Sequence, residues 1–317
     1  MRALVTGGAG FIGSRLAAAL LADGLDVRVL DNLSTGRRAD VPDGADFLEG
    51  DIGDLHVLGR AMESVDVVYH QAALRSVLRS VEAPLATDRV NAAGTLSVLI
   101  AARDAGVRRV VSASSSSVYG LDVPRPTPES AAPRPHSPYA VSKLAGEHYC
   151  RVFWELYGLE TVSLRYFNVY GPGQWAEGQY ATVVPLFIDA LRLGGAVTVH
   201  GDGHQSRDFS FIDDVVRCNR AAAVAPASAC AGKVYNVAGG TPVSVLEVLE
   251  SIARLLDVKP RVTHIESRAG DVRHTHADLR QVRHDLGWEP LVGFEEGLRS
   301  TVSWFVSAHT GSHRNDS

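Results

Sequence analysis

Short apolar runs alternate with longer amphipathic segments through the first half of the chain. The apolar runs, rich in Val or Leu, cover residues 3–6, 27–31, 46–48, 65–70, 110–113 and 161–165. Segments with helical spacing of apolar residues lie between them, at residues 11–22, 55–62, 91–105 and 139–157. Continuous apolar strands separated by helices are typical of a parallel sheet that helices cover on both faces. The pattern therefore predicts an α/β fold built on a doubly wound parallel sheet.

The second half of the chain alternates less regularly and predicts a smaller mixed α/β lobe. Gly171, Pro172 and Gly173 interrupt the chain, and a helix is then expected over residues 182–193. Strands are expected over 197–200 and 234–237, and helices over 244–256 and 294–309. The predicted boundaries are 1–168 for the doubly wound domain, with some later segments packing back on it, and 169–309 for the lobe. The polar tail, 310–317, is predicted to be disordered.

Composition narrows the class of protein. The 317 residues are 45% hydrophobic, which is enough for one large core or two moderate ones. A net charge of −5 gives no electrostatic reason to expect binding to nucleic acid or to an anionic membrane. The apolar runs are too short to cross a membrane, and the first residues enter a strand pattern without a signal peptide. Three scattered cysteines (Cys150, Cys218 and Cys230) complete the expectation of a cytoplasmic protein with reduced thiols.

A glycine-rich turn follows the first predicted strand. Gly7, Gly10 and Gly13 form a Gly-x-x-Gly-x-x-Gly motif that opens a helix, where backbone N–H groups approach a pyrophosphate. Asp31 ends the second strand about 18 residues later, near the spacing of the acid that binds the adenosine ribose. Its carboxylate would repel a 2′-phosphate, so the motif favours NAD over NADP; the alternative is that Asp31 caps the following turn. The adenine ring is expected near Asp51, after the third strand.

The fourth predicted strand ends in small residues. His70 is followed by Gln71, Ala72 and Ala73, which leave room for a cofactor in the crevice at the carboxyl ends of the strands. We expect His70 to be a packed core histidine rather than a base. Asn91 opens the next predicted helix, where it either caps the helix or contacts the cofactor region.

Tyr139 and Lys143 lie four residues apart, so a helix would place them on one face. A free phenol has a pKa of about 10, and a cation one turn away favours the phenolate. This pair is common by chance and gains meaning only from its surroundings. The run of serines from Ser114 to Ser117 lies shortly before it.

Taken together, the motifs resemble the extended short-chain dehydrogenase/reductase superfamily, and more narrowly its NAD-dependent nucleotide-sugar epimerases and dehydratases. The resemblance rests on the glycine motif, Asp31, Ser115, Tyr139-x-x-x-Lys143 and the run 165–168, and it covers residues 1 to about 305. It implies a Rossmann domain with a substrate lobe and a bound NAD. It also implies that Ser115 holds the reacting sugar oxygen, that Tyr139 is the base and acid, and that Lys143 holds the nicotinamide ribose and lowers the tyrosine pKa.

The resemblance also implies the binding residues. Those for the cofactor are Gly7, Gly10, Phe11, Ile12, Gly13, Asp31, Asn32, Ser34, Thr35, Gly36, Asp51, Ile52, Gln71, Ala72, Ala73, Asn91, Tyr139, Lys143 and Tyr166. Those for a UDP-sugar are Arg75, Ser76, Ser115, Ser116, Asn168, Thr182, Val183, Thr198, His200, Arg207, Arg268, Asp271 and Thr275. The arginines suit a pyrophosphate, and Thr275 matches a gate beside the sugar C2 substituent. Three nearby histidines (His264, His274 and His276) lack acidic ligand spacing, so no metal site is predicted.

The residues after Ser115 discriminate between reactions. Dehydratases and decarboxylases of this type carry carboxylates there, whereas this chain has Ser116 and Ser117, and a hydroxyl is a poor proton shuttle. Within the resembled family, these hydroxyls predict a UDP-hexose 4-epimerase, for UDP-glucose/galactose or UDP-N-acetylhexosamines. The resemblance also implies a homodimer whose contact is formed by residues 91–105 and 139–157, and both segments are apolar enough for it. The alternatives are a UDP-glucuronate 4-epimerase, with Arg75 or Arg79 meeting the carboxylate, a net oxidoreductase and a non-catalytic sensor. Trp175 replaces polar residues of related chains, and the sequence gives it no role.

Overall fold

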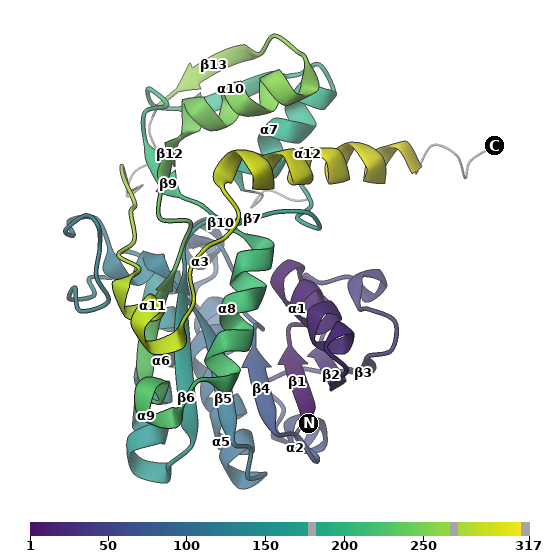
Figure 1. The fold of residues 1–317 in the computed structure, drawn as a ribbon, viewed down its shortest axis with the longest axis vertical. Coiled ribbons are helices and arrows are strands. Elements are labelled where there is room, and N and C mark those ends of the chain that lie inside the picture. Colours follow the sequence, from purple (N-terminus) through teal and green to yellow (C-terminus); the bar gives the residue numbers. More distant parts are fainter. Residues whose placement is uncertain (177–181, 267–271, 312–317) are drawn as a thin grey trace.

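The computed structural model describes residues 1–176, 182–266 and 272–311, and a seven-stranded parallel sheet forms its centre (Figure 1). The strand order is β11-β6-β5-β4-β1-β2-β3. The strands are β1 (Arg2–Thr6), β2 (Asp26–Asp31), β3 (Asp46–Glu49), β4 (Val67–His70), β5 (Arg109–Ser115), β6 (Glu160–Tyr166) and β11 (Lys233–Val237). The order reverses between β1 and β4, which is the point where ligands bind in sheets of this kind. The predicted doubly wound α/β fold is confirmed.

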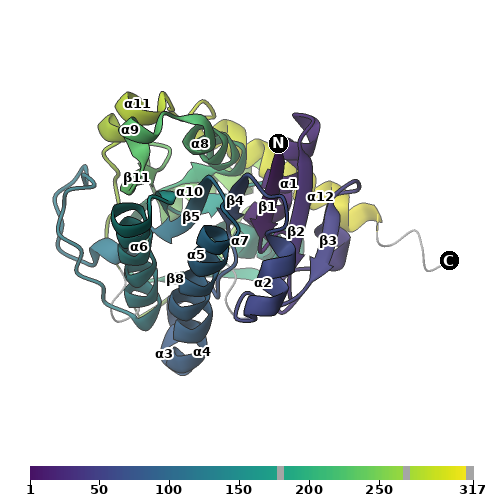
Figure 2. The ribbon, with the colours of Figure 1, turned by 90° about the horizontal axis from the view of Figure 1, so that it is seen from below.

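Helices cover both faces of the sheet (Figure 2). α1 (Phe11–Ala22) and α8 (Ile212–Val224) pack on one face and contact each other. α2 (Leu55–Ala61), α5 (Gly94–Asp104) and α6 (Pro138–Tyr157) pack on the other. The central strands β1, β4, β5 and β6 are almost wholly buried between these layers, which explains their largely apolar sequences, whereas the edge strand β3 is partly exposed.

The start and end of α6 follow from its terminal residues. The Ser137 side chain accepts a hydrogen bond from the Ala140 N–H at 3.1 Å, and Pro138 occupies the first turn. Gly158 ends the helix in the left-handed conformation that glycine adopts without steric cost. The helix therefore begins one residue before Tyr139 and holds it in its first turn.

The second lobe lies above the carboxyl ends of the sheet strands in Figure 1. Its strands are β7 (Val169–Tyr170), β8 (Ala196–His200), β9 (Ser206–Asp208), β10 (Ser210–Phe211), β12 (Pro242–Ser244) and β13 (Arg261–Ile265). Its helices are α7 (Val183–Arg192), α10 (Val245–Leu256) and α12 (Phe294–Gly311). Shorter helices elsewhere are η1 (Arg38–Asp40), α3 (Val77–Glu82), α4 (Pro84–Asp88), η2 (Arg89–Ala93), η3 (Ser116–Tyr119), α9 (Ala227–Cys230) and α11 (Arg280–Leu286).

Three expectations about the elements need correction, and one helix was missed. The strand expected over 234–237 is β11, which pairs in parallel with β6 and so belongs to the central sheet rather than to the lobe. The helix expected to begin at residue 91 is continuous with α4 and η2, because Pro84 starts the helical run in its first turn. α8 was not predicted. The expected disordered tail begins too early, since α12 continues to Gly311; residues 312–317 lie outside the described part.

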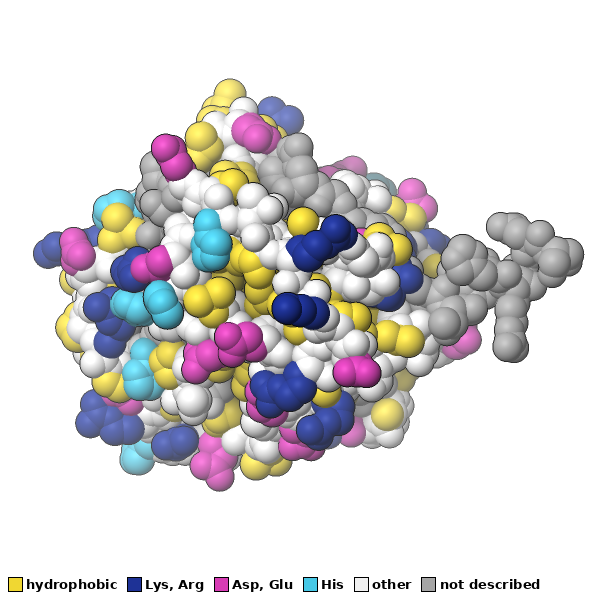
Figure 3. All heavy atoms as spheres, turned by 90° about the horizontal axis from the view of Figure 1, so that it is seen from above, with side chains coloured by type: hydrophobic (Ala, Val, Ile, Leu, Met, Phe, Trp, Pro, Cys, Tyr) yellow, Lys and Arg dark blue, Asp and Glu magenta, His cyan; other side chains and the backbone are white. Residues whose placement is uncertain are grey.

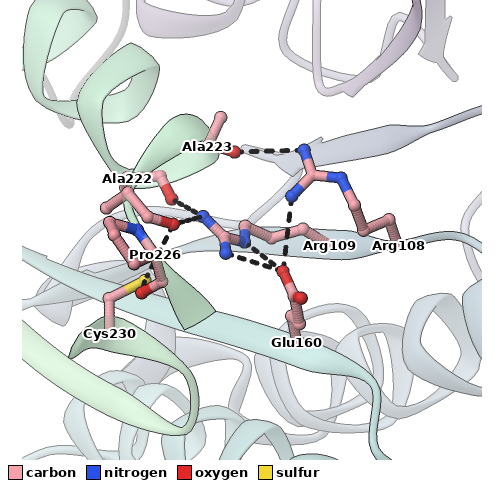
Figure 4. Close-up of polar contacts among 8 residues, drawn as sticks. Arg108, Arg109, Glu160, Ala222, Ala223, Pro226 and Cys230 are labelled. Atoms are coloured by element: carbon pink, nitrogen blue, oxygen red, sulfur yellow. Dashed lines mark hydrogen bonds and ion pairs between the residues drawn. The ribbon is translucent and has the colours of Figure 1, made fainter. Parts of the chain in front are cut away.

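A buried arginine ties α8 to the amino-terminal end of the sheet (Figure 4). Arg109, at the start of β5, is 1% exposed. Its guanidinium donates to Glu160 at 2.7 Å and to the carbonyls of Ala222 and Ala225 at 2.8 and 2.7 Å. Because those carbonyls lie at the carboxyl end of α8, the cation also compensates the helix dipole there.

Cys150, Cys218 and Cys230 are free, as the sequence predicts, and all three are buried. Within the described ranges no helix is long and apolar enough to cross a bilayer.

Candidate active site

The glycine-rich turn between β1 and α1 leaves no space for side chains. Gly7 has φ +69°, and a Cβ there would lie 2.6 Å from the backbone nitrogen of Ala72. A Cβ on Gly13 would lie 2.2 Å from the carbonyl oxygen of Gly7. The backbone therefore comes close to itself at the carboxyl edge of the sheet, beside a cavity of 240 Å³. This cradle fits the pyrophosphate of a dinucleotide at the start of α1.

Most of the predicted cofactor residues line this cavity. Its described lining is Gly7, Gly10, Phe11, Ile12, Gly13, Leu30, Asp31, Asn32, Ser34, Thr35, Gly50, Asp51, Ile52, Gln71, Ala72, Ala73, Leu74, Arg75, Val90, Ala113, Ser114, Tyr139, Lys143 and Tyr166. Two predicted residues, Gly36 and Asn91, are not part of it. Gly36 packs against the backbone of Ala9, where a Cβ would approach to 2.7 Å.

Asp31 is held at the end of β2 by two backbone N–H groups. Its carboxylate accepts from Ala9 at 3.0 Å and from Leu33 at 2.8 Å, and the residue is 9% exposed. The bond to Leu33 shows that Asp31 does cap the following turn, while it still lines the cavity. Nearby, the Asn32 amide donates to the Asp51 carboxylate at 2.7 Å, which joins two predicted cofactor residues.

His70 is a packed core histidine, as expected. Its Nε2 lies 3.0 Å from the Thr95 hydroxyl and its Nδ1 lies 2.8 Å from the Thr6 hydroxyl. Because the Thr95 hydroxyl donates to the Asn91 carbonyl, it accepts from His70, and the Thr6 hydroxyl donates to the other ring nitrogen. Burial, and then the charge of Lys143, lower the pKa of His70 to about 3. The imidazole is neutral and has both of its nitrogens occupied.

Asn91 lies inside a continuous helical run, so the helix-cap interpretation is wrong. Its side-chain oxygen accepts from the Leu74 N–H at 2.8 Å, and its nitrogen donates to the Leu74 carbonyl at 3.0 Å. Asn91 therefore fixes the backbone of a residue that lines the cofactor cavity, rather than lining the cavity itself.

Tyr139 and Lys143 both line the cofactor cavity. The Lys143 ammonium donates to the Ala113 carbonyl at 2.9 Å, and burial lowers its pKa to about 8. Burial raises the pKa of Tyr139, whereas a hydrogen bond with Ser115 and the charge of Arg75 lower it. Burial is the larger effect, so the pKa of Tyr139 is raised overall, while Ser115 and Arg75 favour the phenolate. The predicted effect of Lys143 on the pKa of Tyr139 stays a prediction.

Arg75 joins the cofactor cavity to a second one, since it lines both. Its neighbours hold it in place: Leu74 is fixed by Asn91, and Ser76 caps α3 by accepting from the Arg79 N–H at 3.3 Å. Ser76 has φ +102°, a strained value for a residue with a side chain. Burial, and then the charge of Arg79, lower the pKa of Arg75. A cation is therefore held beside Tyr139 at the junction of the two cavities.

The second cavity has a volume of 820 Å³ and lies mainly between the second lobe and α3. It brings together eight predicted substrate residues: Arg75, Ser76, Asn168, Thr182, Val183, Thr198, His200 and Arg207. The other described residues of its lining are Val77, Leu78, Val169, Tyr170, Val184, Leu186, Phe187, Ala190, Ala196, Val197, Val199, Gln205, Phe209 and Val245. Two arginines and no carboxylate stand in this described lining, which suits an anionic ligand.

Some predicted substrate residues do not reach this cavity. Thr275 is not part of its described lining, and its hydroxyl accepts from the Asp208 N–H at 2.9 Å, so it is engaged with backbone. Ser115 and Ser116 lie at the end of β5 and the start of η3, where Ser115 contacts Tyr139. Arg268 and Asp271 lie outside the described residues.

Sequence reasoning missed Asn219 on α8. Its amide and the Gln71 amide share the Tyr166 hydroxyl, with Asn219 Nδ2 at 2.8 Å and Gln71 Nε2 at 3.1 Å. This network fixes two cavity residues from a helix far along the chain. A polar residue on the buried face of an amphipathic helix was the available signal.

Seen from above, the outer face mixes basic, acidic and histidine side chains without one broad charged patch (Figure 3).

Comparisons with known proteins agree with this geometry. The profile of the NAD dependent epimerase/dehydratase family matches residues 3–238. A UDP-glucose 4-epimerase of Mycolicibacterium smegmatis is 41% identical over 312 residues, covering 96% of this chain and 98% of that protein. The structure of a Thermotoga maritima UDP-glucose 4-epimerase with UDP-glucose superposes with a TM-score of 0.94 at 36% identity, covering 98% and 100% of the two chains. A dTDP-glucose 4,6-dehydratase from Streptomyces venezuelae, with NAD bound, gives a TM-score of 0.90 at 34% identity, covering 98% of each chain.

Proposed function

The chain belongs to the NAD-dependent epimerase/dehydratase family, and on that premise we propose that it is a UDP-hexose 4-epimerase. It is similar both to epimerases and to dehydratases, so the choice between these reactions rests on the residues of the site. The proposed reaction interconverts the gluco and galacto configurations by transient oxidation at C4. In this proposal residues 1–168 bind NAD and the lobe that follows binds the UDP-sugar.

The proposal gives each group at the junction one task. When bound, NAD accepts the hydride from C4 and returns it. Tyr139, as the phenolate, takes the proton of the C4 hydroxyl and later gives it back. Ser115 orients the reacting oxygen through the same hydrogen-bonding position that now reaches Tyr139. Lys143, fixed to the Ala113 carbonyl, holds the nicotinamide ribose.

The observation that carries the proposal is that two hydroxyl residues, Ser116 and Ser117, follow Ser115 beside Tyr139. Elimination of water needs an acid and a base beyond the tyrosine, and at the positions where dehydratases carry them this chain has hydroxyls. The Ser117 hydroxyl donates to the Ser115 hydroxyl at 2.8 Å. The buried carboxylate of Glu147 is occupied elsewhere, by Arg165 at 2.7 and 2.8 Å and by Ser114 at 2.5 Å. Oxidation and reduction at C4 are the chemistry that remains.

The second candidate function is 4-epimerisation of UDP-glucuronate, and Arg75 is the observation that favours it. The guanidinium stands at the junction of the cavities beside Tyr139, where the C6 substituent of a sugar reacting at C4 would lie close. A carboxylate at C6 suits an arginine fork better than a hydroxymethyl group does. Net oxidation, with release of the reduced cofactor, is the third possibility.

We also propose a homodimer formed by α5 and α6. Apolar side chains stand on their outer surfaces, among them Val141 at 52% exposure and the partly buried Leu96, Ile100 and Tyr149. A four-helix contact would cover them. The cytoplasmic location expected from the sequence stays a prediction.

The test is to incubate the purified holoenzyme, without added NAD or reductant, with UDP-glucose, UDP-N-acetylglucosamine or UDP-glucuronate. Proton NMR of the product sugars identifies any conversion to the galacto isomer. We expect conversion toward an equilibrium mixture with at least one substrate; fastest conversion of UDP-glucuronate would favour the second candidate. Accumulation of a 4-keto sugar, or of NADH in proportion to oxidised sugar, would contradict epimerisation.

A further inference from the structure

Trp175 connects three parts of the chain that are far apart in sequence. The Arg37 guanidinium, from the segment after β2, lies over the Trp175 ring at 4.1 Å from its centroid. Trp304, on α12, meets Trp175 edge-on, with ring centroids 4.8 Å apart and an angle of 70°. In Figure 1, α12 extends above α1 and the segment between β2 and β3. One indole is thus packed between the dinucleotide domain and the carboxyl-terminal helix.

Arg37 ends a segment whose preceding residues line the cofactor cavity. Asn32, Ser34 and Thr35 face that cavity at its adenosine end, beside Asp31. Arg37 itself is held in two ways: its guanidinium makes a bidentate contact with Asp40 at 2.8 and 2.9 Å, and its N–H donates to the Ala9 carbonyl at 3.1 Å. A contact on Arg37 therefore restrains the whole segment 32–37.

The segment that carries Trp175 also reaches the glycine-rich turn. A Cβ on Gly173 would lie 3.7 Å from the ring of Phe11, which lines the cofactor cavity. Gln174 fixes the local backbone, because its N–H donates to the Gly171 carbonyl at 3.3 Å and its side chain donates to the Val169 carbonyl at 3.1 Å. Residues 171–176 therefore approach Phe11 through Gly173 and Arg37 through Trp175.

We propose that the stack of Arg37, Trp175 and Trp304 is a latch that closes the adenosine end of the NAD site and slows release of the cofactor. NAD leaves only when segment 32–37 separates from the wall of the cavity at Phe11. The latch joins segment 32–37 to the second lobe, and Gly173 of that lobe approaches Phe11. The three residues are absent from the described lining of both cavities, so they act by positioning the segment rather than by touching NAD.

Retention of the cofactor has a chemical consequence for this family. A reaction that removes a hydride and returns it in the same cycle fails if the reduced cofactor escapes between the two steps. A latch on the adenosine half restrains escape without obstructing the nicotinamide half, where Tyr139 and Lys143 lie. The inference rests on NAD binding alone and not on which sugar reacts.

Arg38 provides a matched control on the same segment. Its guanidinium lies over the Phe47 ring at 4.4 Å, which is the same kind of contact as that of Arg37. Phe47 belongs to β3, so this contact stays inside the dinucleotide domain. Removing Arg38 weakens the segment locally but leaves the connection to the lobe intact.

The test measures how fast bound NAD leaves the holoenzyme when it is mixed with excess alcohol dehydrogenase and ethanol, which convert released NAD to NADH. Loss of one cation–π contact is worth about 1 kcal/mol, or about fivefold in rate. We therefore expect release to be about fivefold faster in Arg37→Ala and Trp175→Ala. Trp175→Phe, which keeps an aromatic face, should stay near the wild type, and so should Arg38→Ala.

The double variant decides whether the two residues act as one device. If they do, Arg37→Ala combined with Trp175→Ala releases NAD no faster than the faster single variant. Release at the wild-type rate in both single variants would overturn the proposal, and so would equally fast release from Arg38→Ala. Should Trp175→Ala fail to fold, Arg37→Ala carries the test. The Arg37 side chain is 35% exposed, so its removal should leave the fold intact. No sugar enters this measurement, so its failure leaves the proposed reaction untouched.

Discussion

Replacing Arg109 by methionine should destabilise the protein without harming the site. The change removes the donor of two carbonyls at the end of α8, those of Ala222 and Ala225. Each buried carbonyl left unpaired costs about 1–3 kcal/mol. Loss of the ion pair between Arg109 and Glu160 costs less, about 1 kcal/mol, because the Glu160 side chain is 21% exposed and keeps its ion pair with Arg108 at 3.3 Å. Methionine also avoids the cost of burying a charge, so the net loss should be about 2–4 kcal/mol.

Thermal unfolding of the holoenzyme at one fixed NAD concentration measures this loss. A decrease of 2–4 kcal/mol should lower Tm by at least about 4 °C in a chain of this size. Activity at low temperature should be unchanged, because Arg109 and Ser115 stand at opposite ends of β5. Arg108→Met is the control: its side chain is 45% exposed and its bond to the Ala223 carbonyl, at 3.2 Å, is only partly buried, so it should cost about 1 kcal/mol or less. An Arg109→Met variant with the wild-type Tm, or an equal loss in Arg108→Met, would refute this account of the network.

Three further predictions concern the proposed catalytic base, the pH dependence of stability and the oligomeric state. Tyr139→Phe should lower kcat by about 10²–10⁴ while bound NAD is retained, as measured by turnover and by cofactor content after gel filtration. His70 has a folded pKa of about 3, below its ordinary 6.5, so the unfolded chain binds more protons between these values. The contribution of His70 to the free energy of unfolding is therefore complete above pH 6.5 and is lost as pH falls, by up to about 1.4 kcal/mol per pH unit. In His70→Gln, the free energy of unfolding measured in urea at several pH values should fall less steeply with decreasing pH. Ile100→Glu should convert a dimer to monomers in sedimentation velocity, and a wild-type monomer would remove the dimer proposal.

The local pattern predicted the elements that depend on local residues. The glycine motif, the position of Asp31 at the end of β2 and the pairing of Tyr139 with Lys143 on one helix are all short-range features. The position of the cofactor cavity that these residues line could be predicted from the sequence, because the carboxyl ends of parallel strands meet at one edge of the sheet. The core role of His70 was predicted as well, since it ends a buried strand.

What the sequence could not supply depends on contacts between distant residues. β11 joined the central sheet because its register fits β6, and nothing in residues 234–237 alone distinguishes that partner from another edge. Asn91 was misread because its partner, Leu74, lies in a different element. Trp175 had no interpretation until Arg37 and Trp304 were placed around it. Arg75 was named from sequence, but its effect on the pKa of Tyr139 needed the fold.

The central claim, that the hydride leaves C4 and returns to C4, is tested most directly with a labelled substrate. Holoenzyme is incubated with UDP-hexose carrying deuterium at C4, using the sugar that proves to be converted, and the products are examined by NMR. The account predicts that the galacto isomer keeps its deuterium at C4, because the same cofactor molecule accepts and returns the label. Deuterium found at C6 of a deoxy sugar would show elimination instead, and deuterium lost to water would show inversion by proton exchange; either result would contradict the account.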